Sequence, residues 1–427
     1  MTDVDATNFF TDDAMIADPY PYYEALRKEC PVRREPHQNV VMVTGYEEAT
    51  AVFNDTATYS SCTSVTGPFP GFPVPLDGLA QDEIAALIAE HRDELPMSDQ
   101  LPTLDPPMHT DHRGLLMRLI TPKRLKENEE FMLRLANRQM DTFIDEGSCE
   151  FINAFASPFA MLVIADLLGV PEYDHERFKV ALLHRQTGGG VGSTSNRPMA
   201  HSPLEYLYQE FTTYIEDRRS NPRDDVLTGL ASATFPDGST PEVIDVVRVA
   251  ANLFAAGQET TVRLLGSAVQ LIAEDAEIQQ LLRERRDLIP NFIEESLRTE
   301  SPIKGDFRLA TTDTTLGGVD IPAGSTLMLL VAAANRDPRH FDDASTFDVN
   351  RPNARQHISF GRGVHTCPGA PLARAEARVC IERLLDRTTD IRISESQHGP
   401  AGDRRFSYVP TFILRGLTQL HIEFTPA

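Results

Sequence analysis

The sequence lacks the marks of several protein classes. Its five cysteines are odd in number, far apart and without a C-x-x-C pair, which argues against a disulfide scaffold or a zinc site. No run of about 18 apolar residues is present, as a membrane-spanning helix needs. The acidic start, MTDVDATNFFTDDAM, lacks the pattern of a secretory signal. We therefore expect a cytoplasmic protein with no membrane association, in which one cysteine carries chemistry and four are buried.

Basic residues are also few. Lys and Arg number 40 against 63 Asp and Glu, and the net charge of −23 repels nucleic acid and anionic membrane surfaces. The 427 residues are 41% hydrophobic and 24% charged, as in ordinary globular proteins. Length alone would allow two or three domains. A single large catalytic domain also reaches this size, and we expect one domain over residues 1–427.

Apolar spacing predicts a mainly α-helical fold with a minor β region. Helices are predicted over 19–27, 46–53 and 82–94, from 109 to 219 with breaks at 121–122, 147 and 169–171, from 239 to 298, and after Pro371. Strands are predicted over 40–43, 319–321 and 327–331, and a hairpin over 406–424. Ser239–Glu242 carries helix-start residues, and about 30 residues of helix from there span about 45 Å, enough to cross a domain.

Two segments look irregular. Residues 60–107 are rich in proline and glycine, and 185–203 contains QTGGGVGSTSNRP. We interpret both as substrate-access loops, with solvent-exposed insertion as the alternative for 60–107. A nucleotide-binding loop is a second interpretation of QTGGGVGST, although it lacks the lysine and the preceding strand that such a loop uses.

The most informative stretch is FGRGVHTCPG at 360–369, which precedes a predicted helix. Backbone N–H groups and the positive end of a helix favour the thiolate form of a cysteine. The stretch resembles the haem-binding signature of the cytochrome P450 family, F-x-x-G-x-x-x-C-x-G. The resemblance implies haem between the long central helix and the helix after the cysteine. It makes Cys367 the axial thiolate, with Phe360 beside the sulfur, Gly369 in the signature and His365 at a haem propionate.

Three further motifs resemble that family. Glu295 and Arg298 form E-x-x-R, the family's structural ion pair, with Arg351 as third member. AGQETT at 256–261 resembles the oxygen-binding motif, in which the acid and alcohol deliver protons to bound dioxygen. That pair, Glu259 and Thr260, argues against the peroxide-using relatives. In it, the Thr260 hydroxyl is expected to bond the carbonyl of Ala256, and Gly257 to let a ligand approach the backbone.

DPPMHTDHR at 105–113 resembles the family's propionate-binding run. By this resemblance His109 and Arg113, one turn apart, clamp the propionates, and Arg308 takes the place of another propionate ligand. One departure from many relatives is Pro368, which has no N–H to offer the thiolate. We expect stronger electron donation by the sulfur and a lower haem reduction potential.

The resemblance implies a monooxygenase that uses haem b, dioxygen and NAD(P)H-derived electrons. No reductase region fits into 427 residues, so ferredoxin and ferredoxin reductase are the expected partners, and Arg362, Arg374 and Arg378 are a candidate basic docking patch. The expected substrate is a hydrophobic terpenoid, steroid or aromatic compound. Candidate pocket residues are Leu253, Ala256, Phe307, Phe412 and Ile413. The alternatives are a haem-thiolate gas sensor, which needs no acid–alcohol pair, and a nucleotide-binding protein that uses QTGGGVGST.

Overall fold

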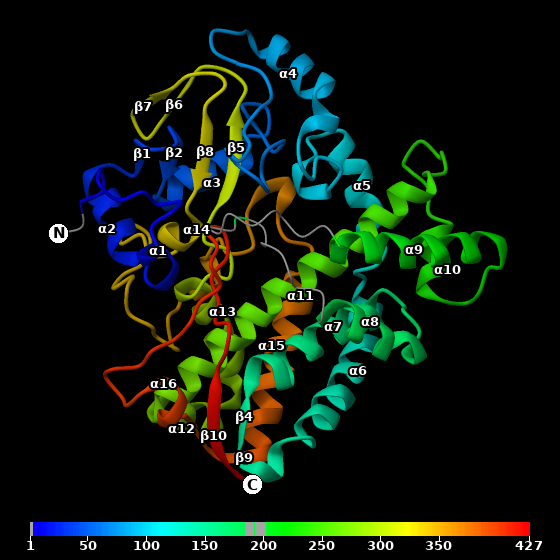
Figure 1. Cartoon of the computed structure of the whole chain (residues 1–427), viewed down its shortest axis with the longest axis vertical. Helices are drawn as coiled ribbons and strands as arrows, with labels where there is room; N and C mark the ends of the chain where they lie inside the picture. Colours follow the sequence, from blue (N-terminus) through cyan, green and yellow to red (C-terminus); the bar gives the residue numbers. More distant parts are fainter. Residues whose placement is uncertain (1–2, 184–191, 193–201) are drawn as a thin grey trace.

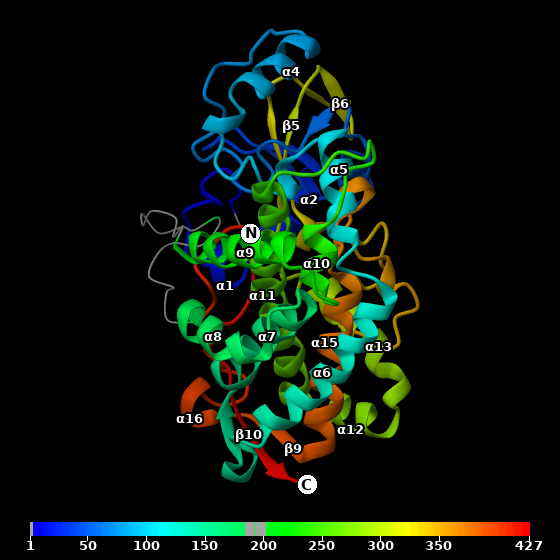
Figure 2. The same cartoon turned by 90° about the vertical axis from the view of Figure 1, so that its right-hand side faces the viewer.

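The structure is a computed structural model that describes residues 3–183, 192 and 202–427. Most of the regular structure is helical, and Figures 1 and 2 show the helices gathered around the long helix α11. The helices are α1 (Ala14–Ala17), α2 (Tyr20–Glu29), α3 (Tyr46–Asn54), α4 (Gln81–Glu90), α5 (Met108–Met117), α6 (Pro122–Met140), α7 (Ser157–Leu167), α8 (His175–Leu183), α9 (Ser202–Ser220), α10 (Val226–Ala231), α11 (Val243–Glu274), α12 (Ala276–Glu284), α13 (Ile289–Thr299), α14 (Val331–Ala334), α15 (Ala370–Arg387) and α16 (Glu395–His398).

The strands form three small sheets. They are β1 (Val32–Arg34), β2 (Val41–Val43), β3 (Tyr59–Ser60), β4 (Ser148–Glu150), β5 (Asp306–Ala310), β6 (Thr314–Leu316), β7 (Val319–Ile321), β8 (Thr326–Leu329), β9 (Thr388–Ile393) and β10 (His421–Pro426). The largest sheet has the order β1-β2-β8-β5-β3, the second β4-β10-β9, and the third pairs β6 with β7. In Figure 1 the largest sheet lies in the upper part of the molecule, and β9 and β10 lie at the bottom, below α11 and α15. The predicted class, mainly α with a minor β region, is confirmed.

Helix α11 organises the main hydrophobic core. Both of its halves bury apolar side chains, among them Phe254 in the first half and Leu265 in the second. Between these halves Ala255 and Ala256 are exposed, although the helix runs through the middle of the molecule. Helices α6, α7, α9 and α15 contribute apolar residues to the same core. A long helix that is buried at both ends but exposed at its centre is suited to form one wall of an internal site.

Three predictions about local structure were wrong. Helix α11 begins at Val243, because Glu242 has an extended backbone at the N-cap and the Ser239 hydroxyl bonds Asp237 instead. Strand β8 ends at Leu329, and Val331 opens α14. Residues 406–424 form only an irregular hairpin with a bridge between Tyr408 and Leu417, while the regular strand β10 pairs with β4 and β9.

The segment 60–107 is more ordered than its composition suggests. It contains α4 and short 3₁₀ helices at Arg92–Glu94 and Leu101–Thr103, and residues 61–64 are buried. Cys62 lies in this buried stretch and Cys380 is buried too, whereas Cys30 and Cys149 are only half-buried, so the expectation of four buried cysteines was wrong for two. In the ranges that the structure describes, no helix has both the length and the hydrophobicity to cross a membrane.

Candidate active site

The loop before α15 wraps around Cys367. The Cys367 N–H donates to the carbonyl of Phe360 at 2.8 Å, and a 3₁₀ turn over Gly363–His365 closes the loop. Gly363 has a φ of +66°, and a Cβ there would lie 2.5 Å from the Phe53 carbonyl oxygen. Glycine is therefore required at this position by both backbone conformation and space. The loop presents one sulfur beside the first turn of a helix.

Opposing effects act on the pKa of the Cys367 thiol. Burial raises the pKa of the thiol, while backbone hydrogen bonds from Gly369 and Ala370 and the charge of Arg113 lower it. These two N–H groups solvate the sulfur although Pro368 contributes none. A coordinating metal deprotonates a thiol outright, so the sulfur and its two donors fit a metal-bound thiolate. This donor set suits haem iron, for which thiolate is an established axial ligand.

Two histidines meet near this loop. The ring centroids of His109, on α5, and His365 are 4.1 Å apart. His365 Nε2 lies 3.1 Å from the Ser61 hydroxyl, whereas neither ring nitrogen of the buried His109 has a hydrogen-bond partner among the described residues. Burial lowers the pKa of His109 to about 4, and that of His365 to about 3. Because a buried ring nitrogen needs a partner, His109 fits an acceptor or donor supplied by a cofactor such as a haem propionate.

The two candidate propionate arginines have different surroundings. Arg113 donates to the carbonyl of Thr366 at 2.5 Å, next to Cys367. Arg308, on β5, is buried and donates to Asp306 Oδ2 at 2.9 Å and to the carbonyl of Phe307 at 2.5 Å. Arg113 is therefore tied to the cysteine loop, while Arg308 is held by its own strand.

The predicted ion-pair residues come together at α13, which carries Glu295 and Arg298, while Arg351 joins them from a later segment. Arg298 donates through Nε and Nη2 to the two oxygens of Glu295, both at 2.7 Å, and Arg351 Nε donates to Glu295 Oε1 at 2.9 Å. Burial alone would raise the pKa of Glu295, but the hydrogen bonds from Arg298 and Arg351 hold it below its usual value. Arg298 also binds the carbonyls of Asn335, Ala344 and Thr346. The triad thus fastens α13 to the chain that leads toward the cysteine loop.

Sequence reasoning missed the neighbouring Glu294. Its carboxylate accepts from Arg374 Nε at 2.6 Å and lies 3.1 Å from His357 Nε2. Burial opposes ionisation, but these two partners lower the pKa of Glu294 to about 2. Glu294 therefore links α13 to α15 and to the start of the cysteine loop. Its partners are 63 and 80 residues away, and the tandem of two glutamates was the only sequence signal.

The middle of α11 carries the candidate oxygen-binding residues. The Thr260 hydroxyl donates to the Ala256 carbonyl at 2.8 Å, as expected from the motif, while the helix continues through it. Glu259 Oε1 accepts from Arg263 Nη2 at 2.6 Å. A Cβ on Gly257 would lie 3.2 Å from the Ile164 side chain. Gly257 therefore allows α7 to pack closely against this part of α11.

The candidate pocket residues fall into two groups. Leu253 and Ala256 lie on α11, the first buried and the second exposed. The other three, Phe307, Phe412 and Ile413, belong to a separate buried cluster. The Phe412 ring lies 6.2 Å from that of Phe307 and 5.5 Å from that of Phe69, between ring centroids. These three rings thus form a connected aromatic cluster, named the aromatic wall below, from the half-exposed Phe69 to the fully buried Phe307.

The candidate docking arginines are mostly neutralised. Arg374 pairs with Glu294, and Arg378 pairs with Glu129 at 2.7 Å and Glu382 at 3.1 Å. Arg362 instead donates to the Tyr46 hydroxyl and the Gln356 carbonyl, and no carboxylate in the described part of the chain pairs with it. The loop QTGGGVGST lies outside the described residues except for Gly192.

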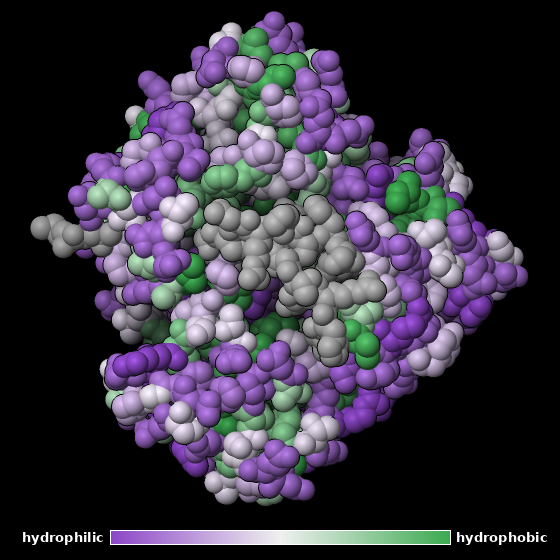
Figure 3. Space-filling model, viewed as in Figure 1, coloured by the Kyte–Doolittle hydropathy of each residue, from purple (hydrophilic) through white to green (hydrophobic). Residues whose placement is uncertain are grey.

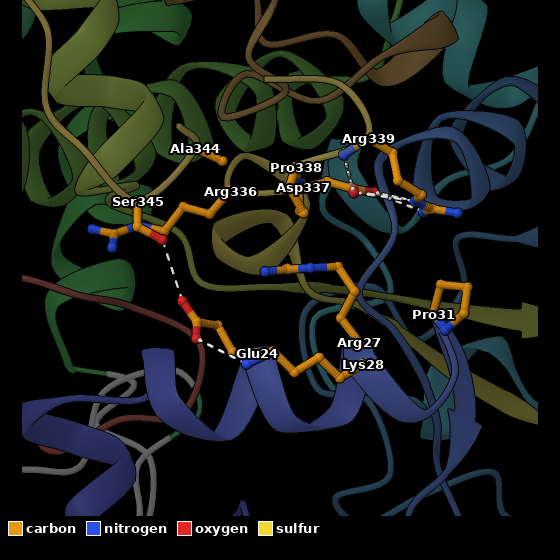
Figure 4. Close-up of a pocket in the computed structure, with 10 residues that line it drawn as sticks. All are labelled: Glu24, Arg27, Lys28, Pro31, Arg336, Asp337, Pro338, Arg339, Ala344 and Ser345. Atoms are coloured by element: carbon orange, nitrogen blue, oxygen red, sulfur yellow. Dashed lines mark hydrogen bonds and ion pairs between the residues drawn. The ribbon is translucent and has the colours of Figure 1, made fainter. Parts of the chain in front are cut away.

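A pocket of about 340 Å³ lies elsewhere, between α2 and residues 336–345 (Figure 4). Its charged side chains are largely paired: Arg339 binds Asp337 and Glu48, and Lys28 lies 3.9 Å from Glu24. None of the candidate haem, oxygen or substrate residues lines this pocket. This pocket shares no residue with the cysteine loop at 360–369.

Comparisons with known proteins agree with this geometry. The family model described as Cytochrome P450 matches residues 199–389. The chain is 32% identical to Cytochrome P450 144 of Mycobacterium tuberculosis, covering 98% of this chain and 91% of that protein. The structure is similar to that of substrate-free cytochrome P450 CYP150A6 from Mycobacterium marinum, with a TM-score of 0.93 and 55% identity over 99% of this chain and 100% of that one.

A second similar structure contains a steroid ligand. It is CYP109E1 from Bacillus megaterium in complex with testosterone, with a TM-score of 0.76 and 26% identity over 95% of this chain and 99% of that one. The full-length similarity and the cysteine loop lead to one conclusion. The chain belongs to the cytochrome P450 family, and is a haem b monooxygenase that uses dioxygen and NAD(P)H-derived electrons from partner proteins.

Proposed function

We propose that the enzyme hydroxylates a hydrophobic small molecule of the terpenoid, steroid or aromatic class. The aromatic wall of Phe69, Phe412 and Phe307 supports this proposal, because small-molecule sites are lined mainly by hydrophobic and aromatic side chains. The testosterone named in the CYP109E1 structure makes steroids the first class to test. Residues 60–107 act as an access segment of a single catalytic domain; the second expected access segment, 185–203, lies mostly outside the described residues.

Each site residue has a proposed task. Haem, when bound, supplies the iron at which dioxygen is activated. Cys367 provides the thiolate ligand, kept solvated by the N–H groups of Gly369 and Ala370. His109, Arg113, His365 and Arg308 are the residues that would hold the haem propionates through charge-assisted hydrogen bonds. The Glu295 triad keeps the loop in place.

The proton path runs along α11. The Thr260 hydroxyl is oriented by the hydrogen bond that it donates to the Ala256 carbonyl. Its oxygen can therefore still accept a hydrogen bond from another group. Glu259, the next residue toward the N-terminus, takes protons from solvent through its half-exposed carboxylate and passes them on through water. Leu253 and Ile413, both buried and apolar, keep bulk water from the reacting carbon.

Electrons come from a ferredoxin and its reductase. Arg362 supports an electrostatic contact with an acidic partner, because it has no carboxylate partner of its own in the described structure. Arg362→Glu is expected to slow reduction and weaken its salt dependence, and an unchanged rate would point to another face. None of the five cysteines forms a disulfide, which favours the reducing cytoplasm as the site of action.

The test is a spectral titration of the purified enzyme with testosterone, a monoterpene, a substituted aromatic and charged polar compounds. We expect the apolar compounds to shift the Soret band, and a hydroxylated product when NAD(P)H, ferredoxin and reductase are added. Shifts only with charged compounds would contradict the substrate class. Binding without any product would favour the gas-sensor alternative.

A further inference from the structure

The acid of the candidate proton path has an unusual partner. Arg263 lies one turn after Glu259 on α11, and its Nη2 is 2.6 Å from Glu259 Oε1. An exposed pair with this spacing only stabilises a helix slightly. Here the arginine side chain is just 10% exposed, whereas the glutamate side chain is 44% exposed. The arginine is therefore the fixed member of the pair and the carboxylate the member that reaches toward solvent.

The stem of Arg263 is held by the C-terminal segment. A Cβ on Gly416 would lie 2.0 Å from Arg263 Cδ and 2.9 Å from its Cγ. The backbone of this segment thus lies directly against the arginine stem, with no space for a side chain between them. A methyl group at Gly416 forces the arginine to move, because such contacts are far below van der Waals distance.

The segment that carries Gly416 is itself anchored. The neighbouring Arg415 donates from Nε to Glu300 at 2.8 Å and from Nη1 to the Ala17 carbonyl at 2.8 Å. The Val409 N–H donates to the Gly416 carbonyl at 3.0 Å, which closes the irregular hairpin. Movement of Arg263 is the cheaper response to a side chain at 416, since the segment is bonded at several points.

The same segment contains Phe412 and Ile413, the candidate pocket residues. The Ile413 carbonyl accepts from the Lys304 N–H at 2.6 Å, so this part of the wall is also fixed. One short stretch of chain therefore contributes the apolar wall and supports the arginine that binds the acid. The geometry links the position of the substrate wall to the position of the Glu259 carboxylate.

We propose that Arg263 is a positioning residue that holds the Glu259 carboxylate in the orientation from which it supplies protons toward Thr260, and that Gly416 is required to keep Arg263 in place. The inference rests on the proposed role of Glu259 and Thr260 in proton delivery. It adds to that role a specific arginine and a specific glycine.

The experiment uses the holoenzyme with ferredoxin, reductase and a substrate that shifts the Soret band. Arg263→Gln is expected to lower product formed per NAD(P)H by about tenfold to a hundredfold, with peroxide released instead, because misplacing a catalytic group by about 1 Å costs on that order. The substrate dissociation constant is expected to stay within about twofold. Arg263→Lys keeps the charge and is expected to restore part of the coupling.

A second readout is independent of turnover. The C–O stretching band of the carbon monoxide complex reports the electric field beside Thr260. We expect it to shift in Arg263→Gln and in Gly416→Ala. Arg248→Gln is the matched control, since Arg248 lies on the same helix and pairs with Asp99 at 3.0 Å. It is expected to leave both the band and the coupling unchanged.

A double-mutant cycle tests the link to Gly416. Gly416→Ala is expected to reduce coupling in the wild type but to have no further effect in Arg263→Ala, where the stem that it displaces is gone. Equal losses in both backgrounds would overturn the role of Gly416. A normal band and normal coupling in Arg263→Gln, while Glu259→Gln loses coupling, would overturn this inference alone. Normal coupling in Glu259→Gln would overturn the proposed proton path as well.

Discussion

The surroundings of Cys367 and those of Phe69, in the segment 60–107, are stabilised by different interactions. Around the cysteine loop, α13 and α15 are joined by buried charges: Glu295 with Arg298 and Arg351, and Glu294 with Arg374 and His357. Along 60–107, Phe69 and Phe72 make mainly aromatic and apolar contacts, and Phe69 is 39% exposed. The surface in Figure 3 is largely hydrophilic, with smaller apolar areas between.

The difference follows from what each region does. Buried ion pairs are directional and fix one geometry, which a metal-binding loop needs. Apolar contacts are less directional, so the half-exposed Phe69 ring, which they hold, can adjust at lower cost. The comparison supports the proposed function, in which the loop around Cys367 holds a fixed cofactor and the aromatic side chains near Phe69 meet a variable substrate.

The largest expected effect is the loss of stability when the triad of Glu295, Arg298 and Arg351 is broken. Glu295→Gln leaves the guanidinium groups of Arg298 and Arg351 buried without a carboxylate, and we expect a loss of about 3–5 kcal/mol in the free energy of unfolding. Urea unfolding followed by circular dichroism measures it. The control is Glu24→Gln, which removes a 3.9 Å exposed pair with Lys28 and is expected to cost at most about 1 kcal/mol. Equal losses would contradict the importance of burial.

The second expected effect is the loss of the stability that the Glu294 carboxylate contributes, and this contribution depends on pH. Its pKa of about 2 in the folded protein lies below the usual 4.5, so its contribution to stability is present above about pH 4.5 and is lost as pH falls through about 2. Glu294→Gln is expected to cost about 1.5–3 kcal/mol at neutral pH, with the difference from wild type shrinking below about pH 4.5. Urea unfolding at a series of pH values measures it. A pH-independent difference would refute the assignment.

The third expected effect concerns Phe69, in the segment 60–107. Phe69→Ala removes two aromatic contacts, with Phe10 and Phe412, from a half-exposed ring, and we expect a stability loss of about 1 kcal/mol. The dissociation constant of a steroid is expected to change more clearly than stability does. A stability loss as large as that of Glu295→Gln would erase the contrast between the two regions.

The smallest expected effect on stability is at the thiolate. Pro368→Leu supplies a backbone N–H next to the sulfur, beyond the bonds from Gly369 and Ala370. We expect less electron donation from the sulfur and a higher haem reduction potential, measured by spectroelectrochemistry. An unchanged potential would mean that the two existing N–H groups already satisfy the thiolate.

The sequence predicted the parts of the site that depend on local spacing. The loop around Cys367 and the pairing of Glu295 with Arg298 follow from residues that are close in the chain. It did not predict Glu294, whose partners come from distant segments, nor the contact between Gly416 and Arg263, which depends on tertiary packing. The start of α11 was misplaced because the Ser239 hydroxyl found a nearer partner in Asp237.

The most direct test of the account is the spectrum of the reduced, carbon monoxide-bound enzyme after haem loading. Ligation by the Cys367 thiolate predicts an absorption maximum at about 450 nm in the wild type, and its loss in Cys367→His. A maximum at about 420 nm in undamaged wild-type protein, or no haem uptake at all, would contradict it.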